Sequence, residues 1–257
     1  MFKTRNIYFL IFLNSFFAFS QNSKLPFKDG EFLKYKISYG LLHAGFTTLQ
    51  VDEIEKNGKT IFHVDGNGWT VGMLDFFFSV EDNYQTYFDK NTLQPLHFIR
   101  KIDEGGYTKN KEIFFNYQKN QALVKDHKNN SEKSFFIQND VNDMLSVLYY
   151  LRSMNFDTIK QDEIFLINMF FDDKMTKIEL KYMGKDIINT KFGKVKTIVI
   201  KPQVEVGRIF KENESVTIWL SDDDNKIPIK IKANVLVGSI KAELYEYKEL
   251  SNIIIFN

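Results

Sequence analysis

The chain has 257 residues, of which 44% are hydrophobic and 16% aromatic, and it contains no cysteine. Its 34 basic residues nearly balance its 33 acidic residues, so the formal net charge is only +1. This balance gives no electrostatic reason to expect a nucleic acid or an anionic lipid as a partner, although it does not exclude local charged patches. The lack of cysteine excludes disulfide bonds, thiolate nucleophiles and cysteine-based metal sites, so stability has to come from a hydrophobic core.

The first twenty residues predict a secretory signal peptide. Lys3 and Arg5 precede a mostly apolar stretch, Ile7 to Phe19, which is followed by the small residue Ser20. The stretch is shorter than the roughly 20 residues that a membrane-spanning helix needs. We therefore expect cleavage after about Ser20 and export of residues 21–257 to the periplasm or the cell envelope.

Alternation of apolar and polar residues with a period of two recurs along nearly the whole remaining chain. Leu33, Tyr35 and Ile37, for example, share one face of a predicted strand. Short connections rich in Gly, Asn and Asp favour hairpins and antiparallel order. We predict a mostly all-β fold, a large antiparallel sheet or open β-barrel of about twelve strands. The predicted strands are 33–39, 46–54, 60–66, 83–88, 97–103, 109–116, 121–126, 163–171, 176–183, 195–201, 215–220, 228–235 and 239–247.

Residues 140–154 depart from this alternation. Met144, Leu145, Leu148 and Leu151 follow the spacing of one face of a helix. We predict one amphipathic helix near 140–154 that fills the open barrel, with a movable lid as the alternative. No change in composition marks a domain boundary, so we expect a single β-rich domain over residues 21–257.

The most aromatic stretch after the N-terminal segment runs from Trp69 to Phe78 and fits neither the strand nor the helix period. Its simplest interpretation is a buried segment between two strands. The alternative is an exposed hydrophobic loop that contacts a membrane or a ligand.

Several segments, taken together and in order, resemble the domain of unknown function 3108 family of exported bacterial proteins. The resemblance implies an exported β-rich domain without an established activity, and a sheet curved around a helix is also similar to lipoprotein-carrier half-barrels. Fold analogy alone does not define a function. The residues that carry the resemblance are 30–35, Gly40, 44–45, Asp82, Tyr84, Asp89, Pro95, 100–107, 143–152, 218–223, 227–228 and 237–244.

The sequence offers no compact catalytic or metal-binding motif. The four histidines, His43, His63, His97 and His127, lack the spacing that places two ligands on one face of a helix or strand. The acidic run 222–225 lacks the glycine and glutamate of an EF-hand loop, so we expect a hairpin turn there. Serine-nucleophile motifs are also missing. From the histidine spacing and the acidic run we expect no metal, and the sequence offers no motif for a cofactor.

Asp82 and Glu104 are the strongest candidates for an acid–base pair, and Arg100 lies between them in the chain. Two carboxyl groups about 5 to 9 Å apart serve glycoside hydrolysis. A structural ion pair of Arg100 with either carboxylate is the simpler interpretation. Arg152 and Arg208 are likewise either anion-binding or structural residues, with the structural role the simpler one.

A transmembrane β-barrel is the main alternative fold, because strands with aromatic residues recur and the chain ends in an apolar run, 253–256. Its lipid-facing positions would have to be uniformly apolar and its inward positions polar. The predicted strand 163–171 is instead apolar on both faces, and the hairpins are short and charged. A soluble β-domain fits the pattern better.

Together these observations favour an exported, non-enzymatic β-domain that binds a hydrophobic or envelope-derived ligand or partner, such as a lipid, a glycan or an envelope protein, in its concave face. Peripheral contact with a membrane is compatible with this expectation. The alternatives are an envelope glycan hydrolase that uses Asp82 and Glu104, and a protein-assembly scaffold that binds through a sheet edge. The expected ligand contacts are Trp69, Phe76, Phe77, Phe78 and Trp219, with Arg100 and Arg152 as polar anchors.

Overall fold

A computed structural model describes residues 25–56, 58–203 and 216–256. Within them, fifteen strands form one sheet. The expected signal peptide and Arg208 lie outside the described residues. The strands are β1 (Phe32–Tyr39), β2 (Leu42–Lys56), β3 (Lys59–Thr70), β4 (Val80–Asp89), β5 (Pro95–Glu104), β6 (Tyr107–Asn116), β7 (Gln121–Asp126), β8 (Ser131–Phe136), β9 (Val141–Asn142), β10 (Ile164–Phe171), β11 (Lys174–Thr190), β12 (Gly193–Pro202), β13 (Val216–Ser221), β14 (Pro228–Asn234) and β15 (Ser239–Lys248).

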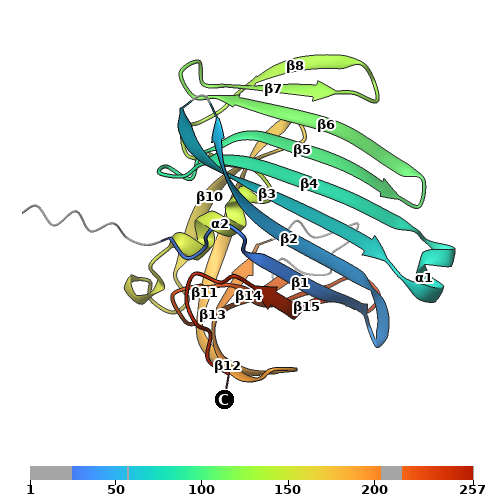
Figure 1. Cartoon of the computed structure of the whole chain (residues 1–257), viewed down its shortest axis with the longest axis vertical. Helices are drawn as coiled ribbons and strands as arrows, with labels where there is room; N and C mark the ends of the chain where they lie inside the picture. The colour runs from blue at the N-terminus through green and yellow to red at the C-terminus, as the bar shows by residue number, and fades with distance from the viewer. Residues whose placement is uncertain (1–24, 57, 204–215, 257) are drawn as a thin grey trace, which may run out of the picture.

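Most strands pair with their neighbours in the chain through hairpins. The order across the sheet is β8-β7-β6-β5-β4-β3-β2-β1-β15-β14-β13-β12-β11-β10-β9. Every pair is antiparallel except β9 with β10. In Figure 1, β2 to β8 form the front wall and β10 to β13 lie behind it, so the sheet curls around an interior. The two edge strands, β8 and β9, do not pair with each other among the described strands, and the barrel is therefore open.

This architecture confirms the predicted fold class, although the structure has fifteen strands rather than about twelve. Each predicted segment overlaps an observed strand. The two strands that the alternation missed are β8 and β9. β8 lies at an edge and is exposed along nearly its whole length, so it has no buried face to alternate, and β9 has only two residues.

The helix α2 (Ser146–Ser153) fills the interior of the open barrel, as expected. Its Tyr149 belongs to a core cluster built on β1 to β4, β12, β14 and β15, and its Leu151 belongs to a second cluster built on β10 to β13. Leu145, just before the helix, contacts a third cluster built on β5 to β7 and β10. A short 3₁₀-helix, η1 (Phe156–Thr158), follows. Among the described residues, no helix is long and apolar enough to span a membrane.

The helix is shorter than predicted because the chain before it is used otherwise. Val141 and Asn142 form β9, and the Asp143 carboxylate accepts hydrogen bonds of 2.8 Å from the backbone N–H groups of Leu145 and Ser146. The same carboxylate accepts the hydroxyl of Thr86 on β4 at 2.5 Å. Asp143 thus orients the start of α2 and attaches it to the sheet.

Arg152, at the end of α2, is fully buried and forms a bidentate ion pair with the fully buried Glu31. Its Nη1 and Nη2 donate to the two carboxylate oxygens at 2.6 and 2.8 Å. Nη2 also donates to the carbonyl of Pro26, and Nε donates to the carbonyl of Asn225. Burial alone would lower the pKa of Arg152, but Glu31 raises it overall. The guanidinium therefore joins the N-terminal segment, the helix and the β13–β14 turn.

We expect Arg152→Met to destabilise the fold strongly, because it leaves the Glu31 carboxylate buried without its partner. Breaking a buried ion pair in this way costs about 3–5 kcal/mol of unfolding free energy. Guanidinium chloride unfolding of the two proteins measures the difference. The double variant Glu31→Leu/Arg152→Met removes both charges and should recover most of the loss. A double variant as unstable as Arg152→Met would contradict this explanation and assign the loss to the bonds with Pro26 and Asn225.

Candidate functional site

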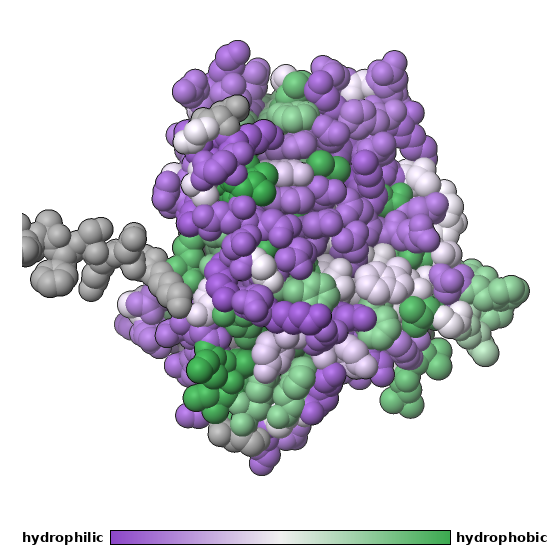
Figure 2. Space-filling model, viewed as in Figure 1, coloured by the Kyte–Doolittle hydropathy of each residue, from purple (hydrophilic) through white to green (hydrophobic). Residues whose placement is uncertain are grey.

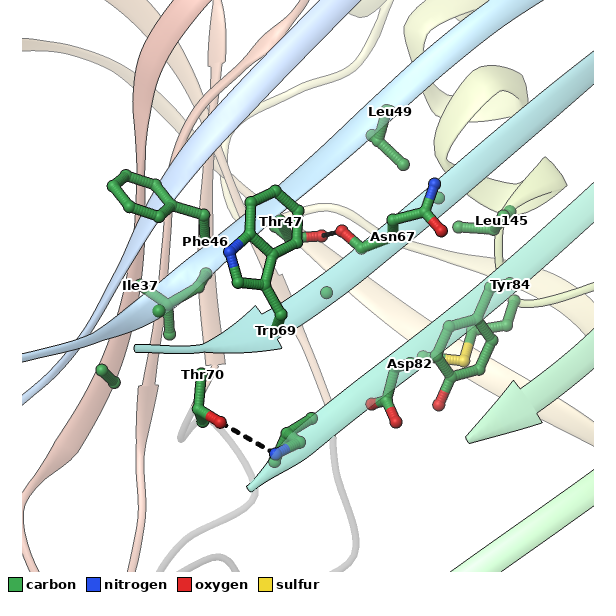
Figure 3. A pocket seen from close by; sticks show the side chains of 16 residues that line it. Ile37, Phe46, Thr47, Leu49, Asn67, Trp69, Thr70, Asp82, Tyr84 and Leu145 are labelled. Carbon is green, nitrogen blue, oxygen red and sulfur yellow. Dashed lines mark hydrogen bonds between the residues drawn. The ribbon is translucent and has the colours of Figure 1, made fainter. Parts of the chain in front are cut away.

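A pocket of about 360 Å³ lies on the inner side of β1 to β4, beside the start of α2 (Figure 3). Apolar side chains and glycines make up most of its wall. Asp82 and Tyr84, side by side on β4, are its titratable lining residues. The lining residues are Ile37, Ala44, Gly45, Phe46, Thr47, Leu49, Gly66, Asn67, Gly68, Trp69, Thr70, Val80, Asp82, Tyr84, Met144 and Leu145.

The pocket exists because two alternate residues of β3 have no side chain. A Cβ added to Gly66 would lie 3.2 Å from Leu49 and 3.6 Å from Leu145, so this position faces the interior. A Cβ at Gly68 would meet Thr47 at 3.8 Å and Asp82 at 3.9 Å, which is ordinary contact distance. On a strand, residues two apart share a face. Gly66 therefore lets Leu49 and Leu145 pack close to the backbone of β3, and Gly68 leaves the hollow beside them.

Asp82 is the most perturbed acid of the pocket. Burial and the nearby Glu104 raise its pKa to about 6, although Arg100 and the backbone of Asp103 act in the opposite direction. Its Oδ1 atom is buried and has no hydrogen-bond partner among the described residues. The described protein therefore leaves one acceptor of the Asp82 carboxyl group unsatisfied at the wall of the pocket.

The predicted acid pair, Asp82 and Glu104, lies on the paired strands β4 and β5, with Asp82 opposite Ile102 and Val80 opposite Glu104. The two carboxyl groups are near enough for Glu104 to contribute to the raised pKa of Asp82. Asp82 lines the pocket, whereas Glu104 does not. Glycoside hydrolysis needs both carboxyl groups beside the same sugar.

Arg100 has a different main partner from the one expected. Its Nη1 atom lies 2.9 Å from Oδ1 of Asp172, in the β10–β11 turn, and its guanidinium stacks 4.9 Å from the ring of Phe171. Lys109 and Lys111 of β6 also contact this carboxylate. Burial opposes the ionisation of Asp172, yet the three cations lower its pKa overall. The turn therefore joins the back of the open barrel to its front wall, which identifies Arg100 as a structural residue.

Of the predicted aromatic ligand contacts, some border the pocket and others do not. Trp69 borders the pocket, and its ring lies 6.1 Å from that of Phe46. Phe76, Phe77 and Phe78 are exposed in and beside the short helix α1 (Gly72–Phe77), outside the pocket. The expectation of a buried segment there is therefore wrong, because the aromatic residues form a projecting helix between β3 and β4.

Two further expectations are corrected. Arg152 lies outside the pocket with its donors used by Glu31 and by backbone carbonyls, so it is not a ligand anchor. Trp219 on β13 does not line the pocket either, and Lys230 lies 5.9 Å from its ring. The acidic run 222–225 forms a turn, in which Asp223 accepts the N–H groups of Asn225 and Lys226.

Sequence reasoning missed the residues that shape the hollow. The period-two pattern gives Gly66 and Gly68 no role, and it treats Ile37, Thr47 and Leu49 as ordinary strand residues. The available signal was two glycines at a spacing of two inside a predicted strand, which indicates a close approach or a missing side-chain layer on one face.

The curled sheet defines a β-barrel-like fold. The family model described as "Protein of unknown function (DUF3108)" matches residues 34–245, and the chain belongs to this family, as the resemblance implied. No curated protein matches the chain.

Two solved structures match the chain over most of their length. One is a β-barrel-like protein of domain of unknown function DUF1849 from Brucella abortus, with 10% identity and a TM-score of 0.59 over 86% of this chain and 98% of that chain. Another is a DUF1089 family protein from Pseudomonas aeruginosa, with 6% identity and a TM-score of 0.40 over 74% of this chain and 90% of that one. At such low identity, the first supports the fold alone.

The raised pKa of Asp82 makes stability depend on pH. Its native pKa of about 6 exceeds the ordinary 3.8, so the folded protein binds this proton more readily than the unfolded chain does. The group therefore favours the folded state increasingly as the pH falls through about 6 toward about 4. We expect Asp82→Asn to melt at a higher temperature than the wild type near pH 8, with the difference vanishing near pH 4.

Thermal unfolding followed by circular dichroism across this pH range measures the effect. Asp173→Asn, which alters an exposed carboxylate, is the matched control and should show no such trend. An Asp82→Asn variant that melts at or below the wild-type temperature near pH 8 would contradict the assigned cost of ionising Asp82.

Proposed function

We propose that this chain is an exported, non-enzymatic binding protein of the cell envelope. Its ligand is an amphiphile that places an apolar body against Gly66 and Gly68 and a hydrogen-bonding group against Asp82. The observation that carries the proposal is the pocket of about 360 Å³. This volume lies within the range of roughly 300–1,000 Å³ that is typical of small-molecule sites.

The chemistry of the wall supports an apolar ligand with one polar group. Ile37, Leu49, Val80 and Leu145 offer contact area without hydrogen-bonding atoms on their side chains. The buried Oδ1 of Asp82 loses a hydrogen bond to water and gains none from the described protein. Rotation of the Asp82 side chain would bring this oxygen to a ligand O–H or N–H, which would fix the orientation of the ligand as well as add affinity.

The two alternative functions have weaker support. A glycan hydrolase would need two carboxyl groups beside one sugar, and of this pair Asp82 alone lines the pocket. A scaffold that extends the sheet would use an edge strand, and β8 offers one. Its exposed Glu132 and Lys133 are charged side chains of the kind that discourage strand addition at an edge.

Gly68→Leu tests the pocket directly, because the new side chain would occupy the hollow while its Cβ makes only ordinary contacts. The probe is N-phenyl-1-naphthylamine, an apolar fluorophore with one N–H donor. We expect its fluorescence to increase saturably with the wild type, and its affinity to fall about tenfold or more in Gly68→Leu, because the ligand loses its apolar contact area.

Thr48→Leu is the matched control, since Thr48 lies next to Thr47 and Leu49 on β2 but does not line the pocket. It adds the same side chain outside the hollow and should keep wild-type affinity. Circular dichroism establishes that both variants fold. Absence of saturable binding by the wild type, or unchanged binding by a folded Gly68→Leu variant, would overturn the proposed function.

A further inference from the structure

Eight large apolar side chains project into solvent from three connections of the sheet, and we call them the apolar rim. Leu41 is fully exposed, and Phe76 and Val237 are 85% and 75% exposed, so these residues are not edges of the core. The members of the apolar rim are Leu41 and Leu42 at the β1–β2 turn, Met73, Phe76, Phe77 and Phe78 in and beside α1, and Leu236 and Val237 at the β14–β15 turn.

The three connections lie at the same end of the sheet. β14, β15, β1, β2, β3 and β4 are consecutive and antiparallel, so every second connection among them falls at one end. The hydroxyl of Tyr39 donates to the carbonyl of Val237, which joins the β1–β2 and β14–β15 turns. Val71 donates its N–H to the carbonyl of Ala44, which joins the start of α1 to β2. Figure 2 shows apolar surface over α1 at the right edge and below it, near the β1–β2 turn.

The charged residue of α1 is turned away from the tips of the apolar rim. Asp75, the carboxylate of α1, points back to the strands, where it accepts the hydroxyls of Thr70 at 2.7 Å and Ser79 at 2.9 Å. The ring of Phe78 packs on Gly105, whose N–H bonds to the carbonyl of Ser79. The helix is therefore fixed to its supporting strands while Phe76 and Phe77 extend beyond them.

Two lysines lie on the strands that flank the β14–β15 turn of the apolar rim. Lys232 of β14 and Lys241 of β15 are directly paired across the strands. Neither forms an ion pair with any other residue of the described chain, although Lys230 two residues earlier is paired with Glu243. Like charges directly opposite each other destabilise a sheet. An anionic surface in front of these two lysines would relieve their repulsion.

We propose that the apolar rim docks on an anionic lipid bilayer, with Phe76 and Phe77 entering the interface and Lys232 and Lys241 facing phosphate headgroups. Separate projecting tips suit a fluid bilayer, into which apolar groups insert roughly 5–10 Å. The positive pair supplies the charge complementarity to anionic lipid. This inference concerns a membrane surface and does not depend on the pocket holding a ligand.

The arrangement also places the pocket near the bilayer. Ile37, Thr70 and Val80 line the pocket and lie near or at those ends of β1, β3 and β4 from which the apolar rim projects. A docked protein would therefore hold the pocket next to the lipid, where an amphiphile has a short path between membrane and protein.

Vesicle flotation of the chain from Gln21 to Asn257 tests the proposal, because every strand lies within that range and the apolar N-terminal stretch would itself bind lipid. We expect the wild type to float with phosphatidylglycerol vesicles and to bind phosphatidylcholine vesicles more weakly. Phe76→Ser/Phe77→Ser should lower the vesicle affinity about tenfold or more, because the two rings no longer leave water. Lys232→Gln/Lys241→Gln should remove the preference for anionic vesicles.

Ile253→Ser/Ile255→Ser is the matched control. It removes two exposed apolar side chains near Asn252, which hydrogen-bonds to Asn225 in the turn at the other end of β14. This variant should float like the wild type. Absence of flotation by the wild type, or equal flotation by Phe76→Ser/Phe77→Ser, would overturn the proposal. A concentration-dependent dimer that Phe76→Ser/Phe77→Ser abolishes, without vesicle binding, would assign the apolar rim to a second copy of the chain instead.

Discussion

A guanidinium group shielded from water sets the arrangement of everything around it. Arg152 cannot lose its proton under ordinary conditions, so its burial requires Glu31 and two backbone carbonyls in fixed positions. Those partners come from the segment before β1 and from the turn before β14. Asn225, which lies in the turn before β14, also forms two hydrogen bonds with Asn252 near the C-terminus. One buried charge thus fixes how far α2 enters the barrel and where both ends of the sheet-forming chain lie.

The position of α2 also shapes the pocket, because Leu145, just before the helix, forms part of its wall. Leu145 packs against the sheet at the point where Gly66 provides no side chain, and the adjacent Gly68 leaves the space unfilled. On the back wall, Asp172 holds Arg100, Lys109 and Lys111. The two walls of the open barrel are therefore joined across its interior by charged contacts between distant strands, not by a continuous ladder of backbone hydrogen bonds. The pocket lies in the part of the interior that neither α2 nor this ion cluster fills.

The fold could be predicted from the sequence because burial on one face leaves a strong period of two, as in Leu33, Tyr35 and Ile37. The same logic explains the failures, since β8 is exposed on both faces and carries no period. The site was harder to predict, because it depends on the register between strands. Asp82 and Glu104 were singled out because they flank Arg100 in the chain, whereas the partner of Arg100 lies 72 residues away, in a turn whose position depends on how the sheet curls. Nothing in local spacing distinguishes the buried Arg152 from an exposed one.

The pairing of β1 with β15 has a consequence for how the chain acquires its structure. The first strand of the sheet lies between β2 and the last strand, and the largest core cluster takes residues from Phe27 to Ile254. Contacts so distant in sequence form late and slowly, because a long loop has to close before they stabilise anything. The N-terminal half therefore cannot complete its core until the C-terminal residues arrive. Such a dependence leaves the apolar faces of the early strands without their partners until nearly the whole chain has been synthesised.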